Sequence, residues 1–182
     1  MNWANRLTVM RMLLIPFFLV FMYLNIPYTY LYAAIIFTIA SLTDILDGYI
    51  ARKEKTVTVF GKVFDPIADK MLVLVALIVL CEQGVIHSLI AIFIIAREIL
   101  ISGFRIYAIS KNGEVISASW LGKTKTVLQD VAIILYLLKD IAIFNWLNLL
   151  YLPVIAISAA LVFTLWSTID YFITNKQSYT EE

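Results

Sequence analysis

The chain has 182 residues, of which 62% are hydrophobic and only 15% are charged. A water-soluble domain of this length would be close to half apolar and about a quarter charged, so most of the surface must face something other than water. The net charge of +1 is uninformative as a total, and we expect no nucleic-acid partner. Cys81 is the only cysteine, which excludes a disulfide framework and a thiolate metal site.

Six segments are apolar and long enough to cross a membrane, which takes about 20 residues. They lie near residues 9–27, 30–51, 62–82, 86–110, 121–140 and 149–172. The first segment follows two arginines, as a signal peptide would, but no small-x-small cleavage site comes after it. We therefore expect a retained first span. The prediction is an all-α, polytopic membrane protein with six transmembrane helices, forming a single membrane-embedded domain over residues 1–182.

The basic residues predict the orientation of these spans. They gather at one set of segment ends: Arg6, Arg11, Arg52, Lys53, Lys55, Lys62, Arg105, Lys111, Lys123, Lys125 and Lys176. The opposite ends have only Lys139 at their margin. Because positive residues stay on the cytoplasmic side, we expect both termini and the polar stretch 52–61 to face the cytoplasm, in a plasma-membrane protein.

Four aspartates occupy the two predicted helices on either side of that polar stretch. Asp44, Asp47, Gly48 and Ala51 are spaced i, i+3, i+4 and i+7, whereas Gly61, Asp65 and Asp69 are spaced i, i+4 and i+8. Each set shares one helical face. Because a short loop joins the two helices, we expect antiparallel neighbours whose carboxylates converge. The small residues between the acids leave room for a ligand and for close helix approach.

The energetics of these acids favour a metal site. One aspartate at the centre of a span costs roughly 2.5–3.5 kcal/mol, so four would cost on the order of 10 kcal/mol. Bound cations would offset that cost, and hard oxygen ligands favour Mg²⁺ or Mn²⁺, with Ca²⁺ or another divalent ion as a substitute. Four carboxylates can share two ions, an arrangement used in phosphoryl displacement. Salt bridges to Arg52, Lys62 and Lys70 are the alternative, but they explain only one or two of the acids.

The same residues resemble the motif of the CDP-alcohol phosphotransferase family, D-x2-D-G-x2-A-R-x8-G-x3-D-x3-D. All eight fixed positions are present: Asp44, Asp47, Gly48, Ala51, Arg52, Gly61, Asp65 and Asp69. The resemblance implies a six-helix membrane fold, a homodimer and a CDP-activated substrate. It also implies that Asp44, Asp47 and Asp65 bind two metal ions, and that Asp69 touches the metal site and acts as general base. Asp47, Gly48, Ala51, Arg52 and Gly61 would line the CDP pocket.

A second set of basic residues lies in the later half of the chain. Arg97 falls inside a predicted span, where an arginine needs a polar partner or a ligand. Cations converging at the ends of two spans suit a phosphate-bearing acceptor. The residues that we expect to bind this phosphate are Arg97, Arg105, Lys123 and Lys125. A simple topology signal is the alternative, and it fits Lys111 better than the arginines.

This region resembles the phosphatidylglycerophosphate synthase branch of the family. The resemblance implies CDP-diacylglycerol as donor, sn-glycerol 3-phosphate as acceptor, and membrane lipids as surroundings. The opening N-R-L-T-V-M-R looks like that branch too, which implies that Asn5 and Thr8 approach the nucleotide. Sister transferases that make cardiolipin, phosphatidylserine or phosphatidylinositol phosphate remain alternatives, as does, more remotely, a cation transporter that uses the four acids as a permeation site.

Overall fold

The computed structural model describes residues 3–24, 26–54, 59–112 and 120–174, and the side chains of 9–24, 26–43, 70–107 and 120–174. These ranges are helical and contain no strand, so the predicted all-α class is confirmed. The long helices are α1 (Trp3–Tyr23), α2 (Thr29–Glu54), α3 (Val59–Glu82), α4 (Ser88–Asn112), α5 (Trp120–Leu138) and α7 (Leu152–Thr174). Two short elements, η1 (Ala142–Phe144) and α6 (Trp146–Leu149), precede α7. Each predicted apolar segment corresponds to one long helix.

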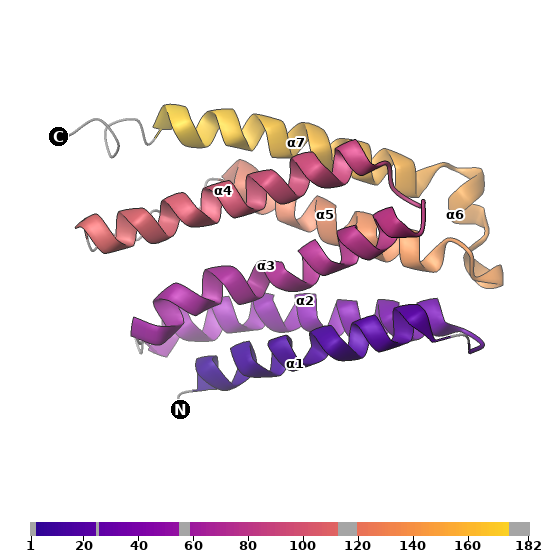
Figure 1. Ribbon diagram of the computed structural model, residues 1–182, viewed down its shortest axis with the longest axis horizontal. Coiled ribbons are helices and arrows are strands. Elements are labelled where there is room, and N and C mark those ends of the chain that lie inside the picture. The colour runs from indigo at the N-terminus through magenta and orange to yellow at the C-terminus, as the bar shows by residue number, and fades with distance from the viewer. Residues whose placement is uncertain (1–2, 25, 55–58, 113–119, 175–182) are drawn as a thin grey trace.

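The long helices run alternately in opposite directions (Figure 1). Their pairwise contacts connect them in a closed ring. Around the ring, α1 packs on α2, α2 on α5, α5 on α7, α7 on α4, α4 on α3 and α3 on α1. Helices α3 and α5 also touch across the middle. The start of α1 and the end of α7 lie at the same end of the bundle, together with the end of α2 and the start of α3 (Figure 1).

The centre of the bundle is packed with small and aromatic side chains. Ala33 and Ala34 on α2 and Ala76 on α3 are 3% exposed or less, which lets helix backbones approach closely. Phe18 and Phe37 fill the space between α1 and α2, with ring centroids 6.2 Å apart. The core therefore lies along the ring axis and holds the helices in a fixed register around the polar cavity described below.

Large apolar side chains also cover the outside of every long helix. Examples are Leu13, Phe17, Ile35, Ile39, Ile78, Ile92, Phe93, Val127, Val131, Ile155 and Val162, all exposed. An apolar surface of this extent is typical of a protein that contacts a membrane. Within the described residues, α7 is the helix that is long and apolar enough to cross a bilayer, while Val9–Tyr23 and Thr29–Thr43 form shorter apolar runs.

The break between α3 and α4 shows how the chain reverses direction at the other end of the bundle. Gly84 has φ of +69°, a left-handed conformation that glycine adopts without a steric penalty. The amide of Gly84 donates to the carbonyl of Cys81 at 3.0 Å, and that of Val85 donates to Leu80 at 2.9 Å. These two bonds form a Schellman motif, which satisfies the last carbonyls of α3 and ends the helix.

Candidate functional site

The aspartate motif occupies the adjoining ends of α2 and α3. Asp44 and Asp47 lie in the second half of α2, and Asp65 and Asp69 lie in the first half of α3. The two helices run in opposite directions (Figure 1). Asp44 is roughly ten residues from the end of α2 and Asp69 is roughly ten residues from the start of α3, so each lies about 15 Å along its helix. The backbone thus places the acids at matching depths, while their side chains lie outside the described residues.

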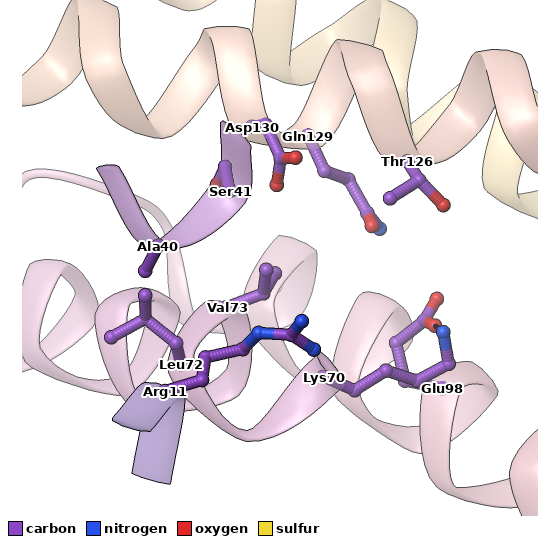
Figure 2. Close-up of a pocket in the computed structure, with 10 residues that line it drawn as sticks. All are labelled: Arg11, Ala40, Ser41, Lys70, Leu72, Val73, Glu98, Thr126, Gln129 and Asp130. Carbon is purple, nitrogen blue, oxygen red and sulfur yellow. Dashed lines mark ion pairs between the residues drawn. The ribbon is translucent and has the colours of Figure 1, made fainter. Parts of the chain in front are cut away.

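A polar cavity borders this motif on both helices (Figure 2). Ser41, one turn before Asp44, lines the cavity on α2, and Lys70, directly after Asp69, lines it on α3. Helices α1 to α5 all contribute to the lining, which consists of Arg11, Ala40, Ser41, Lys70, Leu72, Val73, Glu98, Thr126, Gln129 and Asp130. The cavity measures about 30 Å³, which is room for one or two water molecules. It therefore lies next to the motif in sequence on both α2 and α3.

The walls of the cavity carry charge of both signs. Arg11 on α1 is 4% exposed, and its guanidinium points along the wall toward Lys70, opposite Gln129 and Asp130 on α5 (Figure 2). A buried cation inside an apolar bundle is stable only beside polar partners or a ligand. The cavity thus offers cationic and hydrogen-bonding groups to a charged, polar molecule while its surroundings remain apolar.

At one side of this cavity, the carboxylate of Glu98 on α4 contacts three basic side chains. Its carboxylate pairs with the ammonium of Lys125, lies 3.5 Å from Nζ of Lys70 and lies 3.3 Å from Nη1 of Arg97. Glu98 and Lys125 are 2% and 1% exposed. Because one buried carboxylate contacts three bases, basic side chains gather at this side of the cavity, where they can attract an anion.

Comparison with known proteins identifies the family. A family model described as CDP-alcohol phosphatidyltransferase matches residues 1–166. The chain belongs to the CDP-alcohol phosphatidyltransferase family. The predicted family membership is confirmed, and the eight motif positions lie inside the matched range.

Similar proteins match the chain over nearly its whole length. A protein of Bacillus subtilis (strain 168) is 38% identical over 96% of this chain and 95% of its own length. A protein of Sodalis glossinidius is 36% identical over 100% and 98%, and one of Rickettsia bellii is 39% identical over 85% and 82%. All three are named CDP-diacylglycerol–glycerol-3-phosphate 3-phosphatidyltransferase.

Two of the four predicted acceptor residues of this family member lie together at Glu98. Arg97 contacts Glu98 and also donates from Nη2 to Oγ of Ser167 at 3.0 Å and from Nε to Oγ1 of Thr168 at 3.3 Å. Lys125 is fully buried against the same carboxylate. These contacts tie α4 to α5 and α7. A direct phosphate contact by Arg97 or Lys125 remains a prediction.

The other two predicted acceptor residues have different surroundings. Lys123 is exposed on α5. Arg105 is half-buried on α4, and its Nε has no hydrogen-bond partner within the described part of the chain. The structure therefore does not gather all four bases around one point; it pairs two of them with Glu98 and leaves Arg105 with an unused donor.

For the remaining predicted positions, the structure describes the backbone only. Asn5 and Thr8 lie on α1, Gly48, Ala51 and Arg52 lie on α2, and Gly61 lies on α3. Their side chains, like those of the four aspartates, lie outside the described residues. The predicted metal ligands and CDP contacts thus remain predictions, although every one of these positions is on a helix that lines the cavity.

Sequence reasoning missed several residues of this site. Glu98 was not predicted as a site residue, and Lys70 was expected only as a possible salt-bridge partner for the motif. Gln129, which is 2% exposed and donates to Oγ1 of Thr164 at 3.3 Å, was not predicted at all. A usable signal existed for Glu98 and Gln129, because a polar residue inside an apolar span almost always faces the bundle interior.

Proposed function

We propose that this family member transfers the phosphatidyl group of CDP-diacylglycerol to sn-glycerol 3-phosphate, giving phosphatidylglycerophosphate and CMP in phospholipid biosynthesis. The observation that carries the proposal is the near-full-length similarity to proteins that bear this activity in their names. The complete eight-position motif and the charged cavity beside it support the same conclusion.

The transfer is a single displacement at phosphorus. A hydroxyl of the acceptor attacks the phosphorus that carries the diacylglycerol, the bond from that phosphorus to the CMP oxygen breaks, and CMP leaves with the electron pair. Asp69 takes the proton of the attacking hydroxyl, as a general base within hydrogen-bond reach of it would. The protein contributes positioning and electrostatic stabilisation, which dominate phosphoryl transfer.

Divalent cations fit the donor set of the motif. Carboxylate oxygens are the ligands that Mg²⁺ and Mn²⁺ prefer, and the backbone brings the four aspartates to matching depths on α2 and α3. Asp44, Asp47 and Asp65 would hold two ions, with Asp69 at the edge of the same site. When bound, such ions supply positive charge that stabilises the diphosphate and the departing CMP.

The CDP group belongs beside these acids. We propose that Asn5, Thr8, Asp47, Gly48, Ala51, Arg52 and Gly61 line its pocket. The small residues among them leave room for the nucleotide between helices. The cavity lined by Arg11 and Lys70 then accepts the charged part of a substrate from the bundle interior.

The acceptor phosphate belongs on the α4–α5 side. The Nε of Arg105, which has no partner among the described residues, and the three bases around Glu98 support this location. Arg97 and Lys125 are two of these bases, and the exposed Lys123 contributes at the rim. Guanidinium groups are suited to phosphate because their donors form a planar fork.

We also propose that all six long helices cross the plasma membrane. Their 19–26 residues correspond to about 28–39 Å, against a hydrocarbon core of about 30 Å. Their exposed apolar side chains support lipid contact along each helix. Both termini and the active site would face the cytoplasm, and the enzyme would act as a homodimer, which cross-linking in native membranes can test.

The experiment is metal-dependent release of CMP by the purified protein in lipid nanodiscs. With CDP-diacylglycerol, we expect turnover with sn-glycerol 3-phosphate, none with serine or inositol phosphate, and none with phosphatidylglycerol as the second lipid. Chelation should abolish turnover, and added Mg²⁺ or Mn²⁺ should restore it. Equal rates with a non-phosphorylated acceptor would contradict the proposed acceptor. Cation flux across proteoliposomes without CMP release would contradict the enzyme.

A further inference from the structure

Glu98 is an acid in the middle of an apolar helix, and the transfer chemistry described above does not use it. Its carboxylate oxygens are divided between helices. Oε1 accepts from the ammonium of Lys125 on α5, while Oε2 lies 3.5 Å from Nζ of Lys70 on α3. Arg97, its neighbour in sequence, adds a contact of 3.3 Å to Oε1. One carboxylate thus connects α3, α4 and α5.

The number of cations around Glu98 exceeds what a buried acid needs. A buried charge is costly unless it is paired, and one well-placed partner serves that purpose. Here three bases share one carboxylate. The cluster therefore does more than neutralise one acid, because it also fixes the position of a basic side chain, Lys70, that lines the cavity.

The two lysines that contact Glu98 differ in how far they are exposed to the cavity. Lys125 is 1% exposed, so Glu98 holds it entirely within protein. Lys70 is 16% exposed, lines the cavity and directly follows Asp69. Its ammonium reaches across the cavity edge to Glu98 (Figure 2). Lys70 is therefore the cation through which Glu98 can act on the reacting groups.

We propose that Glu98 is a positioning residue that holds the Lys70 ammonium at the cavity edge, where it faces the diphosphate of the lipid donor. The proposal rests on the proposed function. Without the Glu98 charge, the Lys70 ammonium loses a fixed partner and is no longer held at the cavity edge, so it contacts the diphosphate less often. The effect of Glu98 is thus passed to the donor through Lys70.

A double-mutant cycle tests this coupling. We expect Glu98→Gln and Lys70→Met each to lower kcat/KM for CDP-diacylglycerol by about 10- to 100-fold, the range for loss of a hydrogen bond to a charged group. The double variant should be no worse than the worse single variant, because coupled residues are non-additive. KM for sn-glycerol 3-phosphate should stay within about twofold of wild type, and Glu98→Asp should recover part of the loss.

Several outcomes would overturn the proposal. Additive losses in the cycle would mean that Glu98 does not act through Lys70. A rise in KM for the acceptor alone would assign the effect to Lys125. If Glu98→Gln fails to fold, Lys70→Met still tests the proposal. Full activity of Lys70→Met would show that the Lys70 ammonium does not act on the lipid donor. Glu82→Gln, at the opposite end of α3, is the matched control and should keep wild-type kinetics.

A readout without turnover separates this proposal from the proposed function. In Glu98→Gln, amine acylation followed by mass spectrometry should show Lys70 reacting several-fold faster than in wild type, since charged contacts of this kind restrain an ammonium. The exposed Lys123 should label at an unchanged rate. An unchanged Lys70 rate would refute the positioning role even in an active enzyme. If wild type makes no phosphatidylglycerophosphate but Lys70 labelling responds, the proposed function fails and the contact stands.

Discussion

The two sides of the helix ring differ in which groups neutralise their charged residues. On α4, α5 and α7, the cations Arg97 and Lys125 find partners within the chain, namely Glu98 and two hydroxyls. On α2 and α3, the motif holds four aspartates within about ten residues of the adjoining helix ends, and the mid-helix base Lys70 contacts Glu98 on α4. On the first side, which we call the charge-matched side, the protein supplies partners for its own cations. The other side has carboxylates that suit metal ions bound from solution. Changes on the first side should affect stability more strongly than changes on the second, whereas the largest effects on turnover should come from the motif acids.

The largest effect is expected from the general base. Asp69→Asn should lower kcat by about 10²- to 10⁴-fold, the range for removing such a group, while the purified protein keeps its wild-type unfolding temperature. The readout is CMP release at saturating substrates. Asp140→Asn is the matched control, because Asp140 is exposed at the opposite end of the bundle and pairs only with Lys139 among the described residues. Substantial activity of Asp69→Asn would exclude it as the base.

The second prediction concerns an asymmetry within the Glu98 cluster. Glu98→Gln should lower the free energy of unfolding by about 3–5 kcal/mol, because it leaves the fully buried Lys125 without its carboxylate. Lys125→Met should cost less than half of that, since Glu98 keeps Lys70 and Arg97 as partners. Denaturant unfolding in detergent micelles measures both. A larger loss for Lys125→Met would show that the cluster is not organised around the acid.

These two sides also differ in how far sequence could predict them. The motif helices were predictable because their signal is local: the spacing of Asp44 and Asp47 places both on one helical face, and a short polar break defines the reversal. The six apolar segments were likewise predictable from length alone, and each proved to be a helix. Local spacing thus gave the element order and the candidate metal ligands.

The charge-matched side depends on contacts between distant residues. Lys125 and Glu98 are 27 residues apart, and Arg97 and Ser167 are 70 apart. No periodicity within one helix can indicate which helices become neighbours in the ring. Sequence predicted that Arg97 needs a polar partner or a ligand, but it could not indicate that an acid and two hydroxyls from other positions lie beside it. A phosphate contact by Arg97 remains a prediction.

The third prediction tests the hydroxyls that bind Arg97. Replacing Ser167 with Ala and Thr168 with Val should lower the free energy of unfolding by about 1 kcal/mol, since hydrogen bonds between helices in membranes average near 0.6 kcal/mol each. The measurement is thermal unfolding of the double variant in micelles. Ser158→Ala, an exposed serine on the same helix, is the control and should leave stability unchanged. No loss in the double variant would show that Glu98 alone satisfies the guanidinium.

The smallest effect is expected at the rim, where Lys123 is exposed to solvent. If it attracts the acceptor phosphate, Lys123→Met should raise KM for sn-glycerol 3-phosphate by about two- to threefold at low salt, because an exposed charge contributes at most about 1 kcal/mol. The difference in KM between the variant and wild type should disappear near 1 M salt, because screening shortens the range of electrostatic interactions to about 3 Å. Lys139→Met removes a positive charge from the opposite end of the bundle and should not change KM. A salt-independent change at Lys123 would instead indicate that its ammonium contacts the phosphate directly, in a place that solvent ions do not reach.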